Sequence, residues 1–242
     1  MRSSKNGLKP WKKKTRGLWI RCIPPERSAA FVAAMEAVLC VYALAYDPAL
    51  PVVCMDEQPE QLIGQTRRRF TGSTGRRIED HGYVRHGTCN LWVFTEPLAR
   101  WRDVRTSERR TAVDWAHRVR ALVDDPRYAS ATRIRLVCDN LNTHRAASPY
   151  EAFEATEARR IDERVELVHT PAHGSWLNIA ECELSVLSRQ CLGRRIDTLE
   201  QVGREARAWA AGRNRGQRGV SWQFTTEDAR VKLLSLYPRI VA

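Results

Sequence analysis

The fold is decided by two stretches in the C-terminal half of the chain. Residues 133–144 read RIRLVCDNLNTH, and residues 169–181 read HTPAHGSWLNIAE. The first predicts a buried strand that ends on an acid, Asp139, because a short apolar run followed by turn residues is typical of a central strand. The second predicts a strand end, a turn and a helix whose first turns carry another acid, Glu181.

The patterns outside these two stretches predict a mixed sheet. Apolar runs predict strands at residues 51–56, 83–95, 101–106, 133–138 and 164–169, with a turn at 57–59 and a loop or irregular hairpin at 64–82. Helical spacing predicts helices at about residues 27–46, 109–123, 149–160, 176–190 and 198–211 and after Thr226, with Ser148, Ser175 and Thr226 as caps. Three strands joined by hairpins precede strands joined through helices. We therefore expect an α/β fold in which a mixed five-stranded sheet carries helices on both faces.

Three acids are expected to meet at one edge of this sheet. Asp56 ends the first strand and Asp139 ends the fourth, so the two lie side by side if these strands are neighbours. Glu181 would come from a helix that packs against the same edge. Three carboxylates without a countercharge repel one another, and a Mg²⁺ or Mn²⁺ ion would relieve this because such ions prefer oxygen ligands. Acids at strand ends are common, so spacing alone leaves open that any one of them is structural.

The charge of the chain favours a polyanionic partner such as nucleic acid. Of its 242 residues 43% are hydrophobic, and its net charge is +12. Eight basic residues and no acid lie in residues 1–21. Basic side chains that are either solvated or contact the DNA backbone are Lys12, Lys13, Lys14, Arg67, Arg68, Arg69, Arg213 and Arg215.

The cysteine pattern and the apolar stretches indicate a cytoplasmic protein without a membrane span. The seven cysteines are an odd number with no Cys-x-x-Cys, which is typical of buried thiols in a reducing compartment. The apolar residues 29–46 contain Glu36, and a carboxylate in the middle of a bilayer costs about 2.5–3.5 kcal/mol on insertion scales. We therefore interpret them as a helix of a soluble protein, and no signal peptide is expected.

Four segments are expected along the chain. They are a basic tail at residues 1–26, an appendage helix at 27–48, a catalytic domain at 49–195 and a helical extension at 196–242.

Two motifs carry a family resemblance. The DNxxxH of residues 139–144 and the SxLNxxE of residues 175–181 together resemble the DDE transposases of the Tc-one/mariner superfamily, in its bacterial insertion-sequence branch. The MDEQ of residues 55–58 is similar to that family's first acid, and residues 222–233 are similar to its closing segment. The resemblance covers roughly residue 20 to the end, and the paired motifs are its specific part.

The resemblance implies a ribonuclease-H-like fold and a metal-dependent catalytic triad. The acids at its positions are Asp56, Asp139 and Glu181, which would bind Mg²⁺ or Mn²⁺, as two ions. Glu183 is the rival third acid, and only one of the two glutamates can face the site because two residues on a helix are about 200° apart. Glu57 should point to the face opposite to Asp56 if the strand continues.

Auxiliary roles are implied for polar residues beside the acids. Asn140 and His144 would help to place phosphate or water, although His144 could equally be a structural polar residue. Asn178 and His173 are weaker candidates that are expected to hold the turn before the helix.

The implied function is DNA strand cleavage and strand transfer in transposition, with DNA as partner and possible pairing with a second copy or a full-length transposase. Family members usually carry an N-terminal helix-turn-helix region, so the chain is expected to be an N-terminally truncated catalytic half. The alternatives are a catalytically silent remnant that binds DNA or a full-length transposase, and a ribonuclease-H-like nuclease.

Overall fold

The computed structural model describes residues 12–15, 18–21, 27–66, 70–71, 77–78 and 81–239. Its centre is one five-stranded sheet with the order β7-β6-β3-β8-β9. These strands are β3 (Val52–Gln65), β6 (Tyr83–Glu96), β7 (Trp101–Ser107), β8 (Ile134–Cys138) and β9 (Val165–His169). The β7, β6 and β3 strands are antiparallel, whereas β3, β8 and β9 run parallel. The predicted mixed five-stranded sheet is therefore confirmed.

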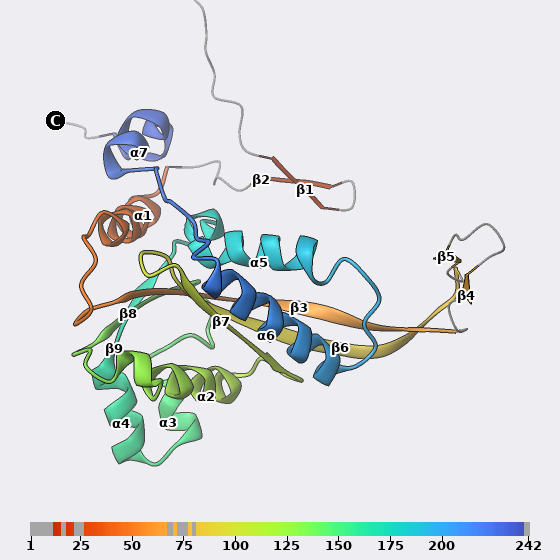
Figure 1. Cartoon of the computed structure of the whole chain (residues 1–242). Coiled ribbons are helices and arrows are strands. Elements are labelled where there is room, and N and C mark those ends of the chain that lie inside the picture. The colour runs from red at the N-terminus through yellow and green to blue at the C-terminus, as the bar shows by residue number, and fades with distance from the viewer. Residues whose placement is uncertain are drawn as a thin grey trace, which may run out of the picture.

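Helices cover both faces of the sheet, as predicted (Figure 1). One face carries α2 (Ala112–Val123), α3 (Ser148–Ala152) and α4 (Ala155–Arg164), and the other carries α1 (Ala29–Tyr42), α5 (Ile179–Gln190) and α6 (Leu199–Arg215). Alternation along β3 divides the core accordingly, because Val53 and Met55 join the cluster under α2 and Cys54 joins the cluster under α1 and α5.

Shorter elements complete the chain. They are β1 (Lys12–Thr15), β2 (Leu18–Arg21), β4 (Phe70–Thr71), β5 (Arg77–Ile78), α7 (Thr226–Lys232) and the 3-10 turns η1 (Pro126–Tyr128), η2 (Ser175–Leu177) and η3 (Leu234–Leu236). The α7 helix lies against α1, where Arg230 donates two hydrogen bonds to Glu36. The domain boundaries remain a prediction.

The first strand does not end at Asp56, so the turn predicted at residues 57–59 was wrong. β3 continues through Pro59 to Gln65 because it pairs with β6 along this whole length. Its pairing with β8 ends at Cys54 in the described sheet, so beyond Cys54 β3 has no strand partner on that side, where the missing N–H of Pro59 is tolerated.

Three predicted helix caps were also wrong. The helix expected at 149–160 is divided into α3 and α4, and Ser148 does not cap it, because its hydroxyl donates to the carbonyl of Thr143. Ser175 begins the turn η2, and Asn178 caps α5 instead. The last helix is capped by Thr225, one residue before the predicted cap.

The cysteines fit the expectation of buried thiols only in part. The described cysteines are free, and Cys40 and Cys182 are exposed. Three are buried, namely Cys54, Cys89 and Cys138. Cys22 lies outside the described residues. Among the helices that the structure describes, none combines the length and the apolar character that crossing a membrane requires.

Candidate active site

Asp56 and Asp139 lie level with each other on neighbouring strands. β3 and β8 are parallel and Cys54 pairs with Val137. Two residues further along each chain come Asp56 and Asp139. The expectation that the first and fourth strands are neighbours is therefore confirmed, and their acids emerge at the same edge.

Asn178 fixes the start of α5 against β3 and thereby places Glu181. Its side-chain amide donates to the carbonyl of Met55 at 2.8 Å, and its Oδ1 accepts from the backbone N–H of Ala180 at 3.1 Å. One side chain thus caps the helix and ties it to the residue before Asp56. Glu181 follows in the first turn of the helix.

A hydrogen bond from α1 and a constrained backbone hold the turn before α5. Tyr42 of α1 donates its hydroxyl proton to the carbonyl of Leu177 at 2.9 Å. His173 has a left-handed backbone with φ of 63°, which a non-glycine residue rarely adopts. At Gly174 an added Cβ would come within 2.5 Å of Pro171, so this turn requires glycine.

The carboxyl group of Asp56 lies in surroundings that disfavour its charge. Burial raises its pKa most strongly, and the charges of Glu181, Asp139 and Glu57 raise it further, to about 8. Among the residues that the structure describes, no lysine or arginine lies within ion-pair distance of Asp56. The site therefore brings several carboxylate oxygens together, and this donor set suits Mg²⁺ or Mn²⁺.

The rival acid Glu183 has different surroundings. Its side chain is 1% exposed and lies 3.2 Å from Nε of Arg102 and 3.0 Å from Nη2 of Arg213. Its charge is already neutralised within the fold. The same contact accounts for Arg213, which was expected to contact DNA but is mostly buried in this ion pair because α6 packs on the sheet.

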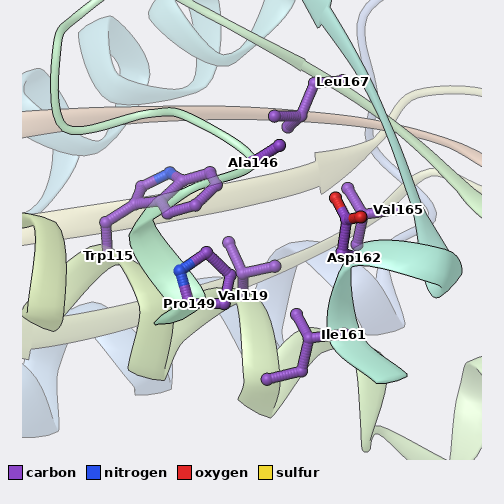
Figure 2. A pocket seen from close by; sticks show the side chains of 8 residues that line it. All are labelled: Trp115, Val119, Ala146, Pro149, Ile161, Asp162, Val165 and Leu167. Carbon is purple, nitrogen blue, oxygen red and sulfur yellow. The ribbon is translucent and has the colours of Figure 1, made fainter. Parts of the chain in front are cut away.

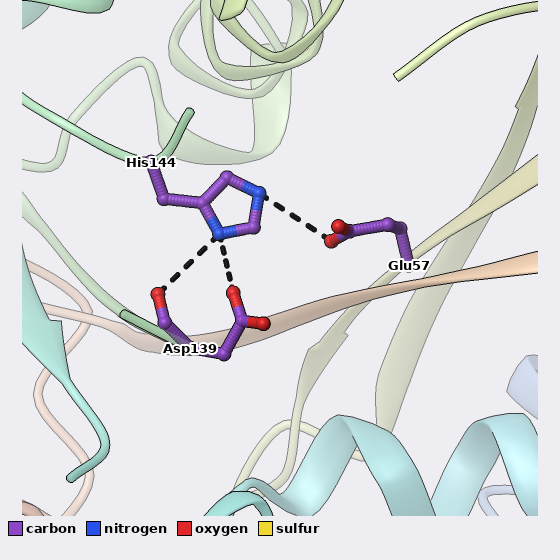
Figure 3. Close-up of side chains that lie close together, drawn as sticks. All are labelled: Glu57, Asp139 and His144. Atoms are coloured by element: carbon purple, nitrogen blue, oxygen red, sulfur yellow. Dashed lines mark hydrogen bonds and ion pairs between the residues drawn. The ribbon is translucent and has the colours of Figure 1, made fainter. Parts of the chain in front are cut away.

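His144 lies between two acids (Figure 3). Its Nδ1 is 2.5 Å from Oδ1 of Asp139, and its Nε2 is 3.4 Å from Oε2 of Glu57. The ring stacks on Trp115 of α2. Because Glu57 contacts the same ring, its side chain lies on the α2 face of the sheet, opposite to the face of Asp56, as predicted. Burial raises the pKa of Glu57, whereas His144 and Arg110 act in the opposite direction.

These three residues are not arranged around one ion. The two acids contact opposite nitrogens of the imidazole ring, whereas a single cation is bound by one ring nitrogen. Nδ1 also lies 3.4 Å from the backbone carbonyl oxygen of Asp139, so this nitrogen is directed at Asp139 itself. We therefore interpret them as a hydrogen-bonded group next to the acids. The sequence analysis assigned no role at the site to Glu57. Its position next to Asp56 was the available signal for such a role.

The remaining predicted residues are only partly described. Asn140 is exposed next to Asp139, and Arg215 is exposed at the end of α6. Lys12, Lys13 and Lys14 lie in β1, but their side chains are outside the described part of the chain, as are Arg67, Arg68 and Arg69 altogether.

A cavity of about 150 Å³ lies between α2, α3, α4 and β9, and Asp56, Asp139 and Glu181 are not among its lining residues (Figure 2). Its lining is mostly apolar and includes one acid, Asp162. Such a lining does not suit a phosphodiester, so the acids at the sheet edge are the candidate active site.

Comparison with known proteins gives one family and a set of similar folds. The family model described as DDE superfamily endonuclease matches residues 51–203. A chain of the Mos1 mariner paired end complex with Mn is 17% identical with a TM-score of 0.52, and the match covers 85% of this chain and 62% of that one. A chain of the Mos1 strand transfer complex is 14% identical with a TM-score of 0.57, and the match covers 95% of this chain and 68% of that one. The chain thus spans about three-fifths to two-thirds of the length of these structures. No curated protein matches the sequence.

Proposed function

Since the chain belongs to the DDE superfamily endonucleases, we propose that it is the catalytic domain of a transposase of the mariner type, in the bacterial insertion-sequence branch. It would cut DNA strands at the ends of a mobile element and join them to target DNA. One of the similar structures is a Mos1 strand transfer complex, which agrees with this reaction.

The observation that carries the proposal is the meeting of three acids from separate elements. Asp56 comes from β3, Asp139 follows β8, and Glu181 lies in the first turn of α5. The charges of the latter two help to raise the pKa of Asp56 to about 8. A fold retains such mutual repulsion where a bound cation relieves it.

Asp56, Asp139 and Glu181 would hold the cations, which we propose to be two Mg²⁺ or Mn²⁺ ions. Two of the similar structures are Mos1 paired end complexes, one with Mn and the other with Mg. When bound, such ions make a water or a 3′-hydroxyl more nucleophilic and stabilise the charge of the leaving oxygen. The protein's own part is to bring the carboxylates together and, through Asn178, to hold Glu181 beside β3.

DNA is the proposed partner, in the cytoplasm. The net charge of +12 favours binding to the phosphate backbone. The exposed side chains of Arg110 and Arg215 are available for such contacts, and Arg110 lies 3.9 Å from Glu57 beside the acids. A similar fold is seen in a Mos1 transposase paired-end complex with the left transposon end.

The test is metal-dependent nicking of DNA by the full chain. The substrates are duplexes that carry the inverted repeats flanking the gene, and Mg²⁺ or Mn²⁺ is added or withheld. Asp139→Ala should abolish nicking while circular dichroism shows an intact fold. Glu151→Gln, which removes an exposed acid of α3 distant in sequence from the triad, is the control and should nick at the rate of the wild type.

Each alternative has its own outcome. Unchanged nicking by Asp139→Ala contradicts the proposed site. Faster cleavage of a DNA/RNA hybrid than of duplex DNA favours a ribonuclease-H-like nuclease. Salt-dependent DNA binding without cleavage in either metal favours a protein that only binds DNA or another transposase.

A further inference from the structure

The buried ring of His144 joins an acid of the proposed active site to one outside it. Asp139 belongs to the proposed active site, and its Oδ1 lies 2.5 Å from Nδ1 of the ring. Glu57 lies outside the site, and its Oε2 is 3.4 Å from Nε2. The side chain of His144 is 0% exposed and that of Glu57 is 3% exposed. The ring lies within ion-pair distance of both carboxylates, and its Nδ1 also lies 3.4 Å from the backbone carbonyl oxygen of Asp139.

The ring is held from several directions. Its face stacks on Trp115, with ring centroids 5.5 Å apart and an angle of 27° between the planes. The backbone carbonyl of His144 accepts from Nε2 of His169 at 2.8 Å, and its backbone N–H donates to Leu141 at 3.0 Å. The imidazole is therefore fixed relative to the ends of β8 and β9.

A fixed ring determines which oxygen of Asp139 remains available. Oδ1 is buried against Nδ1, although the side chain as a whole is 27% exposed. Figure 3 shows the second carboxylate oxygen turned away from the ring. With Nδ1 protonated, its N–H is directed at Asp139, where it lies 2.5 Å from Oδ1 and 3.4 Å from the backbone carbonyl oxygen.

We propose that His144 and Glu57 are positioning residues that hold Oδ1 of Asp139 and leave Oδ2 to bind a divalent cation. The inference rests on the proposed function, because that function assigns Asp139 to the cation. It adds that the affinity for the cation depends on a hydrogen bond behind the ligand. Outer partners of this kind typically change metal affinity by about 10–100-fold.

The test compares two substitutions of the same histidine. In His144→Asn the amide reaches the position of Nδ1 and can still donate to Asp139, whereas in His144→Gln it reaches that of Nε2 and contacts Glu57 only. Binding of Mn²⁺ to the full chain without DNA is followed by electron paramagnetic resonance. We expect His144→Gln to weaken Mn²⁺ binding about 10–100-fold and His144→Asn to restore most of the loss.

A purely structural role predicts a different pattern. Both variants would then lose stability against urea while the folded protein binds Mn²⁺ as tightly as the wild type, and this result overturns the proposal. Equal weakening by both variants overturns it as well. Asp139→Asn tests the proposed metal site separately from the positioning role. If this variant binds Mn²⁺ like the wild type, the proposed metal site is wrong and the positioning role is excluded with it.

A measurement on the wild type covers the case in which the variants do not fold. Nitrogen-15 NMR of the histidine side chains identifies His144 by the contact of its ring with Trp115. We expect a protonated, hydrogen-bonded Nδ1 whose signal shifts when Mg²⁺ is added. An unprotonated Nδ1 would exclude donation to Asp139 and overturn the proposal.

Discussion

Glu181 and Glu183 lie two residues apart on α5, yet their charges meet opposite surroundings. Glu183 is buried between the guanidinium groups of Arg102 and Arg213. Glu181 adds to the carboxylates that raise the pKa of Asp56 to about 8. Burial alone therefore does not identify a functional acid: Glu183 lies in an ion pair with two arginines, whereas Glu181 belongs to a group of acids whose charges together raise the pKa of Asp56.

The two glutamates also explain how one helix serves two purposes. Two residues on a helix are about 200° apart, so the side chains leave α5 on nearly opposite sides. The Glu183 side fastens the helix to Arg102 of β7 and Arg213 of α6. The Glu181 side faces β3 near Asp56, where Asn178 holds the first turn against Met55. A rigid attachment on one side thus supports the geometry on the other.

The largest expected effect separates the two glutamates by activity. Glu181→Gln should lower the rate of metal-dependent DNA nicking about a thousandfold or more, because it removes a proposed ligand of the cation. Glu183→Gln should keep most of the rate at a temperature where circular dichroism shows it to be folded. The reverse pattern would make Glu183 the third acid and break the comparison.

The two glutamates should also differ in their contribution to the stability of the fold. Glu183→Gln leaves Arg102, whose side chain is 0% exposed, buried with a neutral partner. Loss of one member of a buried ion pair typically costs about 3–5 kcal/mol, and urea denaturation of the full chain should show a loss of this size. Glu181→Gln, measured in parallel without metal, should lose less stability, because Glu181 is half-buried whereas Glu183 is buried. A loss below about 1 kcal/mol in Glu183→Gln would mean that the pair is as weak as a surface pair.

The sequence predicts the fold well where local pattern and long-range pairing agree. The strand that ends on Asp139 follows from its apolar run, and the neighbouring position of Asp56 follows from the order of the elements. The pattern fails at residues 57–59, because pairing with β6 extends β3 through a proline that local propensity treats as a break.

The candidate site was less accessible to sequence reasoning. Glu181 was preferred over Glu183 from motif position, but the arginine partners of Glu183 come from residues 30 and 81 positions away, so no local pattern reveals them. The same holds for Glu57 and His144, which meet only because β3 and β8 are neighbours. Arg213 shows the converse: it was expected to be solvated or to contact DNA, but it lies in α6 and pairs with Glu183.

A smaller effect concerns the stability of the metal-free protein. Asp56→Asn removes a buried carboxyl group whose ionisation is opposed by three other acids, while its amide oxygen can still accept from the N–H of Glu57. At pH 8 and without metal, this variant should be more stable than the wild type by more than about 1.4 kcal/mol, the equivalent of one pKa unit. Mg²⁺ should then raise the melting temperature of the wild type much more than that of the variant. A variant that is less stable without metal would show that Asp56 has a structural countercharge, as Glu183 does.

The last prediction concerns the dependence of this difference on pH. The pKa of Asp56 is raised from 3.8 to about 8 in the folded protein, so the folded state binds more protons than the unfolded state between these values. The contribution of Asp56 to stability is therefore fully present below about pH 4 and is lost as the pH rises to about 8, with a slope of at most about 1.4 kcal/mol per pH unit. Urea denaturation of the metal-free wild type and of Asp56→Asn across this range isolates the contribution, because the other groups titrate in both proteins. Stability curves that stay parallel would show that Asp56 ionises as an ordinary carboxyl group, and the contrast between the two glutamates of α5 would then lose its electrostatic basis.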